Sequence, residues 1–449
     1  MGRMVAASFA LAAALGAADP PRLVVVAPQA LNGALSEYVA WRSADLPVEV
    51  ATLESVLAST PGADDPEKMK RYLFDAWRER GVRYALLVGD ADVFPVRYMA
   101  LDRVTAPAFD VAFYPSDLYY ADLAKRDGSF DDWNASREGH HAGYFGEVRG
   151  EKNKSGPVNF DAIDYRPEIA VGRWPVSTPE ETARVARKTM AFEARSPSRT
   201  AAFICVDGWI DARGMLDAAI AKLPRGWSAE RRYYAREGER ERTPPPDAAE
   251  AVRLVNAGAT IVFHAGHGED HGWSGSLGSG DLGKLDNAAA PAIFFSIGCS
   301  TARFATLPPY EAYEDVEGRA HAGTNAGEVF AAPPPPPAPY ARGPFNPPGF
   351  GERLLREGPS GAAAYVGCNT GGQPCAATLL DGFVTALGDT KERPRLGDLW
   401  ARAVTLYFER ENLETLEPTE SWYPPSIFFQ GMKYMLFGDP AMRLPGPSD

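Results

Sequence analysis

Two short apolar runs, residues 260–263 and 292–297, most constrain how this chain can fold. Each is rich in Ile, Val and Phe, is too short for a helix and ends in small residues. Such runs are typical of buried strands in a parallel sheet. Because the carboxyl ends of neighbouring strands lie together at one edge of an open α/β sheet, we predict that His267 and Cys299, which follow these runs, lie side by side there.

This pair has the chemistry of a nucleophile and its base. A thiol beside an imidazole can lose its proton at neutral pH and become an activated nucleophile. Gly268 follows the histidine and has no side chain to obstruct a substrate. The N–H groups of Gly268 and Cys299 can together bind a developing oxyanion. The sequence therefore predicts covalent catalysis by Cys299, with His267 as general acid and base.

The fragment FHAGHGEDHGW, followed later by FFSIGCSTARF, resembles the gingipain-type cysteine peptidases of family C25, which have the caspase-like fold of clan CD. Further similar fragments are YALLVGDADVFPVRY, YRPEIAVGRWPVS and GMKYMLFGDPAMRL, so the resemblance spans residues 22–444. It implies an endopeptidase with a Cys–His dyad that acts on protein or peptide substrates. In arginine-specific members an acidic residue before a strand orients the catalytic histidine, and Glu168 stands at the matching position.

The order of predicted elements indicates an α/β fold with mostly parallel, caspase-like sheets flanked by helices. The first predicted elements are strands at 22–27, 48–52 and 84–88 and helices at 31–44 and 65–80. This βαβαβ order is typical of a parallel sheet. A second α/β unit follows the segment Ser196-Pro197-Ser198. We therefore expect two subdomains: residues 19–197, which carry an acidic flap, and residues 198–449, which carry the catalytic pair.

The amino terminus predicts export. Residues 1–18 combine Arg3, a short apolar stretch and small residues, which is the pattern of a signal peptide. That stretch is too short to span a bilayer, and no later run is long enough for stable membrane insertion. We expect a secreted, periplasmic or cell-surface protein. The net charge of -13 argues against a nucleic-acid partner, and the oligomeric state stays open.

Four cysteines are too few for a disulfide scaffold. Cys205 lies in an apolar strand and is expected in the core. Cys368 and Cys375 flank a turn-rich segment, where a local disulfide is plausible in an oxidising compartment. That pairing would leave Cys299 as a free thiol, and whether it forms is left open.

An acidic segment within residues 116–147 offers oxygen ligands of the kind that Ca²⁺ requires. The candidate ligands are Asp127, Asp131, Asp132, Asn134 and Glu147. Their spacing is not that of an EF-hand loop, and the alternative is a solvated acidic flap. Members of the resembled family carry similar Asp- and Asn-rich segments here. The expectation is a structural Ca²⁺ and no cofactor for catalysis.

Two alternative functions stay open. His264, His267 and His271 are close in sequence and suggest a zinc site, although no metalloprotease signature surrounds them. The chain would then be a non-enzymatic or metal-dependent exported binding protein on the same fold. Alternatively, a transpeptidase that processes exported proteins would use the same catalytic groups with an amine acceptor.

Substrate specificity depends on the first side-chain pocket. A preference for Arg or Lys requires an acidic residue there, for which Glu180, Glu181 and Asp281 are the candidates. Trp273 is either a pocket wall or part of the core. Residues 307–348 include the sequence PPPPPAP, which enforces an extended conformation. We expect this stretch to form a surface loop near the site.

Overall fold

The computed structural model describes residues 20–105, 111–134, 143–161, 163–195, 198–324, 329–331 and 334–448. The predicted signal peptide lies outside the described residues, as does part of the predicted boundary at 196–198. No helix in these described ranges has the length and apolar character that a bilayer span would need.

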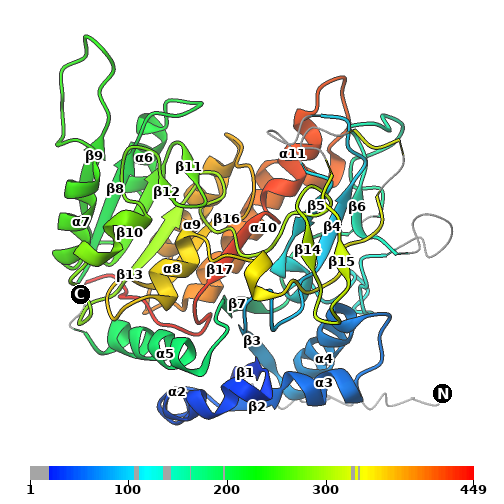
Figure 1. The fold of residues 1–449 in the computed structure, drawn as a ribbon. Helices are drawn as coiled ribbons and strands as arrows, with labels where there is room; N and C mark the ends of the chain where they lie inside the picture. The colour runs from blue at the N-terminus through cyan, green and yellow to red at the C-terminus, as the bar shows by residue number, and fades with distance from the viewer. Residues whose placement is uncertain are drawn as a thin grey trace, which may run out of the picture.

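One ten-stranded sheet runs through the molecule (Figure 1). Its strands are β1 (Arg22–Ala27), β2 (Val48–Thr52), β3 (Val82–Val88), β7 (Ala170–Trp174), β8 (Thr200–Cys205), β9 (Ser228–Tyr233), β10 (Ile261–Ala265), β13 (Ala292–Ser296), β16 (Ala362–Cys368) and β17 (Tyr434–Phe437). The strand order is β2-β1-β3-β7-β17-β16-β13-β10-β8-β9. All neighbouring strands are parallel except β16 and β17, which are antiparallel. The sheet therefore has two parallel halves that run in opposite directions.

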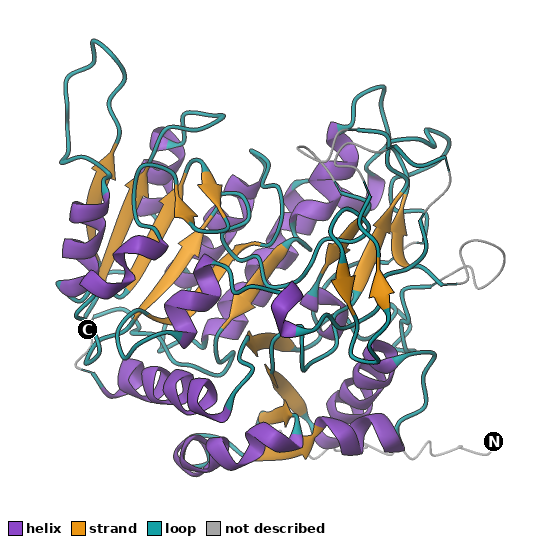
Figure 2. Cartoon of the chain, viewed as in Figure 1, coloured by secondary structure: helices purple, strands orange, loops and turns teal. Residues whose placement is uncertain are grey.

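The helices cover both faces of this sheet (Figure 2). They are α1 (Gln29–Asn32), α2 (Ser36–Arg42), α3 (Leu53–Ser59), α4 (Asp65–Arg80), α5 (Pro179–Ala194), α6 (Arg213–Ile220), α7 (Ala248–Asn256), α8 (Phe350–Arg356), α9 (Ala376–Gly388), α10 (Leu396–Arg410) and α11 (Tyr423–Gln430). Local sequence explains several helix ends. The Asp64 side chain caps α4, which ends at Gly81 in the left-handed conformation, and Thr178 and Glu181 form a capping box on α5.

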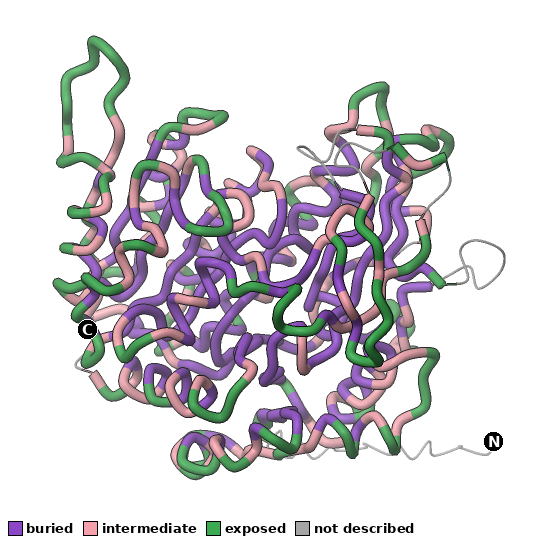
Figure 3. Tube along the Cα trace, in the orientation of Figure 1, coloured by how far each residue is buried: buried purple, intermediate pink, exposed green. Residues whose placement is uncertain are grey.

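The two faces of the sheet are packed by separate apolar layers. Alternate residues of β1 illustrate this, because Val24 belongs to the apolar cluster that includes residues of α4, α9 and α10, while Val25 belongs to the cluster that includes residues of α2, α5 and α8. Figure 3 shows the resulting buried interior along the sheet. Strands buried on both faces explain the continuous apolar runs in the sequence. The predicted α/β fold with a mostly parallel sheet and flanking helices is confirmed.

The sheet is continuous across both predicted subdomains. β17 belongs to the carboxyl-terminal segment, yet it lies between β7 and β16 and joins the two halves. The sequence reading missed this strand because four apolar residues cannot be distinguished from a buried helix segment by periodicity. It also missed the small sheet of β4 (Tyr98–Leu101), β5 (Phe113–Pro115) and β6 (Phe145–Val148).

The proline-rich segment packs on this small sheet. Val96 donates a backbone hydrogen bond to the carbonyl of Pro339, and the Tyr144 hydroxyl donates to that of Pro334 at 2.6 Å. Pro336 and Pro337 line a pocket with Tyr144. The segment is thus a surface element of the amino-terminal half. Its prolines within the described residues do not line the cleft that contains His267 and Cys299.

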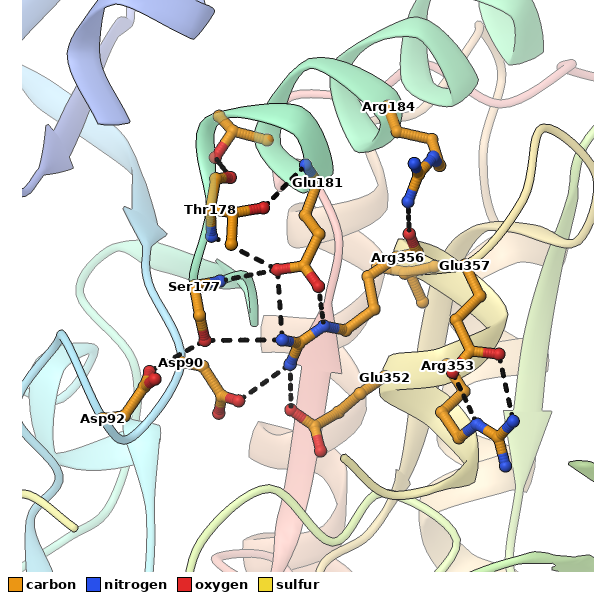
Figure 4. A network of polar contacts seen from close by, with 12 residues as sticks. Asp90, Asp92, Ser177, Thr178, Glu181, Arg184, Glu352, Arg353, Arg356 and Glu357 are labelled. Atoms are coloured by element: carbon orange, nitrogen blue, oxygen red, sulfur yellow. Dashed lines mark hydrogen bonds and ion pairs between the residues drawn. The ribbon is translucent and has the colours of Figure 1, made fainter. Parts of the chain in front are cut away.

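A buried ion-pair network fastens the two halves together (Figure 4). Arg356, at the end of α8, pairs with Asp90 at 2.9 Å and with Glu181 at 3.0 Å, and its guanidinium also donates to Ser177. Asp90, Ser177 and Glu181 come from the amino-terminal half. Glu352 on α8 lies 3.7 Å from the same guanidinium. Burial, together with the nearby Asp90 carboxylate, raises the pKa of Glu352 well above its usual range.

Candidate active site

The predicted catalytic pair follows two adjacent strands. β10 and β13 pair in parallel with His264 opposite Ser296. His267 and Cys299 come shortly after the ends of these strands, and both side chains line one cleft at that edge of the sheet. The structure therefore brings together the two residues that the strand pattern placed side by side.

Other segments complete the cleft. Its lining consists of Gly208, Trp209, Ile210, Ala212, Gly266, His267, Ile297, Cys299, Gly372, Gln373 and Pro374. The first four residues follow β8, the neighbour of β10, and the last three follow β16, the neighbour of β13. The sequence reading missed Trp209, Ile210 and the 372–374 segment. The sequence feature that could have identified them is that each segment follows a strand whose carboxyl end reaches this same edge.

The two catalytic loops are packed backbone against backbone. A Cβ at Gly298 would lie 3.0 Å from the Cα of Gly268 and 3.1 Å from the Gly268 nitrogen. A Cβ at Gly268 would lie 2.6 Å from the Thr301 side chain and 3.1 Å from the Cys299 carbonyl oxygen. Neither position has room for a side chain. These two glycines therefore allow the histidine loop and the cysteine loop to approach each other.

Backbone donors surround the thiol. The Gly372 N–H donates to Sγ of Cys299 at 3.2 Å. Ser300, next to Cys299, has a positive φ of 54°, and its N–H donates to the Thr370 carbonyl at 2.7 Å. The chain turns sharply after Cys299 and is held there by the loop that follows β16. The thiol in turn lies 3.7 Å from the Gly372 carbonyl, to which it can donate.

His267 is held through its backbone. Its N–H donates to the Asp207 carbonyl at 3.3 Å, and its own carbonyl accepts from Ser274 at 3.1 Å. The ring of Trp209 meets the imidazole edge to face with centroids 6.4 Å apart. Within the described part of the chain, neither imidazole nitrogen has a hydrogen-bond partner, so both remain available in the cleft.

The position of Glu168 corrects the expectation that it orients His267. Its carboxylate accepts hydrogen bonds from the N–H groups of Leu123 and Ala124, at 2.6 and 3.1 Å. Glu168 precedes β7, which is four strands from β10 in the sheet. At the usual inter-strand spacing this is roughly 19 Å, which a glutamate side chain does not span.

The N–H groups of Gly268 and Cys299, predicted as oxyanion donors, are without an acceptor among the described residues. Gly268 pairs with Trp273 in the hairpin of β11 (Gly268–Glu269) and β12 (Gly272–Trp273). Because Ser274 N–H donates to the His267 carbonyl, Gly268 and Trp273 form the non-hydrogen-bonded pair of this ladder. The Gly268 N–H therefore makes no hydrogen bond to β12. For the Cys299 N–H, no acceptor is found among the described residues.

The three histidines proposed as a zinc site point to different environments. His264 is buried, stacks on Trp273 with centroids 4.5 Å apart, and shares a 2.8 Å hydrogen bond with Ser296. Burial lowers its pKa to about 3, so the ring is neutral. His271 is exposed and pairs with Glu269 and Asp270. No group of three His, Cys, Asp or Glu that could hold a metal occurs in the described ranges.

Trp273 itself is part of the core rather than a pocket wall. It is 2% exposed, and its indole N–H donates to the Tyr365 hydroxyl at 3.2 Å. The Ser296 hydroxyl also accepts from the Gly298 N–H at 3.1 Å. His264 and Trp273 thus support the turn before Cys299 from beneath.

The five predicted Ca²⁺ ligands do not form a ready coordination shell. Asp127 is exposed and accepts from Ser129, whereas Asp131 is buried and accepts from the Trp133 N–H. Asp132 accepts from the Asn134 N–H, and Glu147 is buried in β6. The set therefore divides between surface and interior.

A different acidic group lies close to the buried members of that set. Burial, reinforced by the charges of Glu147 and Asp131, raises the pKa of Asp161 to about 7. One oxygen of Asp161 and one of Asp122 are buried without a hydrogen-bond partner among the described residues. Carboxylates are the kind of oxygen ligand that Ca²⁺ requires, but those of the described residues do not converge on one point in this structure.

All four cysteines are free thiols. Sγ of Cys368 donates to the Thr370 carbonyl at 3.2 Å, and Cys375 lies by the hydroxyls of Tyr407 and Tyr423. The disulfide considered between Cys368 and Cys375 is therefore not formed in this structure, because the two thiols have separate buried partners.

Helix α8 ties the site to the rest of the molecule. The Phe350 N–H donates to the Asp270 carbonyl at 2.7 Å, and the Gly351 N–H donates to the Thr301 carbonyl at 2.9 Å. The amino-terminal end of α8 therefore holds both catalytic loops, while its other end carries Arg356 and the network of Figure 4.

Comparison with known proteins gives concordant results. The model of Peptidase family C25 matches residues 17–445. The crystal structure of the Arg-specific cysteine proteinase gingipain R (RgpB) superposes with a TM-score of 0.59 at 15% identity, covering 94% of this chain and 78% of that chain. A complex of the pro- and mature domains of Porphyromonas gingivalis RgpB gives 0.60 at 15% identity, covering 94% and 79%. No curated protein matches significantly. The fold is thus that of the gingipains, as the sequence resemblance implied.

Proposed function

The chain belongs to peptidase family C25 and is a cysteine-type peptidase, and we propose that it is an exported endopeptidase with Cys299 as nucleophile and His267 as general acid and base. The observation that carries this assignment is the shared cleft at the ends of β10 and β13. Export rests on the signal-peptide pattern of residues 1–18.

The reaction begins with proton transfer from the Cys299 thiol to His267. The thiolate, which accepts a hydrogen bond from Gly372, attacks the carbonyl carbon of the scissile peptide, and a C–S bond forms. The carbonyl oxygen gains negative charge, which the N–H groups of Gly268 and Cys299 stabilise. Because these donors belong to tightly packed loops, they need no rearrangement as the charge develops.

Collapse of this intermediate breaks the C–N bond. His267 returns its proton to the departing amine, and the acyl group remains on Cys299 as a thioester. Water then enters, His267 accepts its proton, and the thioester is hydrolysed. The same acyl-enzyme would yield a new peptide if an amine replaced water, so the acceptor decides between hydrolysis and transpeptidation.

The proposal includes a structural Ca²⁺ near the buried acidic group. It is supported by the proximity of Asp131, Glu147 and Asp161 and by the raised pKa of Asp161. These carboxylates would supply hard oxygen ligands. The cation would neutralise charge in the amino-terminal half and take no part in the reaction at Cys299.

A peptide-library digestion read by mass spectrometry tests the catalytic assignment. Wild-type protein is expected to cleave internal bonds, and Cys299→Ala and His267→Ala to lose this activity with unchanged circular dichroism. His271→Ala and Cys375→Ala are the matched controls and should retain it. Full activity in either Cys299→Ala or His267→Ala would refute the assignment. Adding an amine acceptor and analysing ligated products tells hydrolysis from transpeptidation.

A further inference from the structure

The catalytic cleft has an apolar wall. Trp209 and Ile210 contribute to it from the loop after β8, Ile297 from the segment after β13, and Pro374 from the loop after β16. Apart from His267 and Cys299 themselves, none of the described residues that line the cleft has an ionisable side chain. The groups that would touch a substrate side chain here are therefore almost entirely hydrocarbon and aromatic.

The two residues at the mouth of the cleft are unusually exposed. Trp209 is 64% exposed and Ile210 is 41% exposed. Neighbouring large apolar side chains left in water mark binding surfaces more often than isolated ones do. Trp209 also meets the imidazole of His267, so a group packed against the indole lies next to the reacting atoms.

The nearby carboxylates do not line the cleft. Asp207 is exposed and accepts from the Gly208 N–H at 3.0 Å, and Asp211 pairs with Arg213 at 2.7 Å. Asp281 pairs with Lys284, and Glu181 belongs to the Arg356 network. None of the three acidic residues considered for an Arg or Lys pocket lines the cleft. A substrate cation buried there would lack a counter-charge, which is costly.

Building on the proposed function, we propose that this cleft binds an apolar substrate side chain at the residue whose carbonyl is attacked, and that Trp209 and Ile210 determine this specificity. A Cβ at Gly208 would lie 3.0 Å from Cα of Gly266, so these two glycines let the loops after β8 and β10 approach each other, and a Cβ at Gly372 would lie 3.7 Å from Cα of Cys299. The apolar side chain removes Trp209 and Ile210 from water and closes the cleft over the thiol. The substrate class is thus peptides cleaved after aliphatic or aromatic residues.

Fluorogenic peptides that differ only at the residue before the scissile bond test this proposal. We expect kcat/KM for Leu, Met or Phe to exceed that for Arg or Lys by roughly tenfold or more, the scale on which an apolar pocket discriminates. Trp209→Ala should lower kcat/KM for the apolar substrates, mainly through KM. Ile210→Asp should raise relative activity toward Arg and Lys. Phe345→Ala, an exposed aromatic outside the cleft, is the control and should change neither.

The outcomes separate this proposal from the assignment of the nucleophile. If Cys299→Ala abolishes cleavage and the wild-type protein prefers Arg or Lys, the apolar pocket is overturned and Cys299 stays the nucleophile. Cleavage after apolar residues that persists in Cys299→Ala refutes the nucleophile. Peptide chloromethyl ketones give a second readout. A reagent with an apolar residue next to the ketone should label Cys299 faster than a reagent with arginine there. Faster labelling by the arginine reagent contradicts the pocket.

Discussion

The backbone N–H of Gly372 points at Sγ of Cys299 and donates to it at 3.2 Å. The two residues come from loops after neighbouring strands, β16 and β13. A backbone donor at this distance hydrogen-bonds directly to the sulfur, and among substitutions at Gly372 only proline removes the N–H. The loop after β16 therefore contributes to the chemistry of the thiol as well as to the wall of the cleft.

We predict that alkylation is selective for Cys299. Burial raises the pKa of Cys205 and Cys368 to about 12 and that of Cys375 to about 11, so these thiols stay protonated at neutral pH. The thiolate is the species that reacts with iodoacetamide. Peptide mapping after brief treatment should show one modified residue, Cys299, with a parallel loss of activity. Equal labelling of Cys375 would contradict this prediction.

We predict that Glu168 supports stability rather than catalysis. Glu168→Ala leaves the N–H groups of Leu123 and Ala124 without their acceptor, which costs about 1–3 kcal/mol for a buried group. Urea unfolding should detect this loss, whereas kcat of the folded fraction should stay at the wild-type value. Glu168→Gln keeps an acceptor oxygen and should be milder. A tenfold fall in kcat for Glu168→Gln, without a stability change, would restore the orienting role.

We predict that Asp161 makes stability depend on pH. Its pKa is raised from 3.8 to about 7 in the folded protein, so between these values the folded state holds a proton that the unfolded chain has lost. The free energy of unfolding therefore falls as pH rises through this window. Asp161→Asn should be more stable than wild type at pH 8, by about 2–4 kcal/mol, and equal to it near pH 4. Parallel stability curves for the two proteins would exclude this.

The calcium proposal makes a linked prediction. If Ca²⁺ binds the carboxylates near Asp161, it should raise the Tm of wild type at pH 8, and a chelator should reverse the rise. At a concentration about 100 times Kd the gain is about 2.7 kcal/mol. Asp161→Asn should show a smaller response, because one charged ligand is gone. A Tm that is indifferent to both calcium and chelator would remove the proposed ion.

We predict that Arg356 is critical for joining the two halves of the sheet. Arg356→Met leaves Asp90 and Glu181 without their cation, and breaking a buried pair in this way costs about 3–5 kcal/mol. Arg353→Met is the matched control on the same helix. Its partner Glu357 is partly exposed, so about 1 kcal/mol or less is expected. Thermal unfolding compares the two, and adding Asp90→Asn to Arg356→Met should recover part of the loss. Equal effects of both arginine variants would argue against this role.

Local sequence determined the strands and the placement of the catalytic pair. The apolar runs before His267 and Cys299 are buried on both faces, and such runs form strands whatever their neighbours are. Because parallel strands share a carboxyl edge, two residues that follow adjacent strands meet there. This is why Cys299, His267 and Gly268 could be identified, and why most of the predicted strands and helices match the structure.

Only the tertiary structure decided the strand order and what surrounds the pair. β17 enters between β7 and β16, and this long-range pairing separates Glu168 from His267 by four strands. The pairing of β8 with β10 and of β16 with β13 brings Trp209 and Gly372 to the cleft from loops far away in sequence. Periodicity reports which face of a segment is buried, but strand neighbours are chosen by packing between distant segments. The placement of His267 and Cys299 at one edge was therefore predictable from local sequence, whereas the walls of the cleft were set by the assembled sheet.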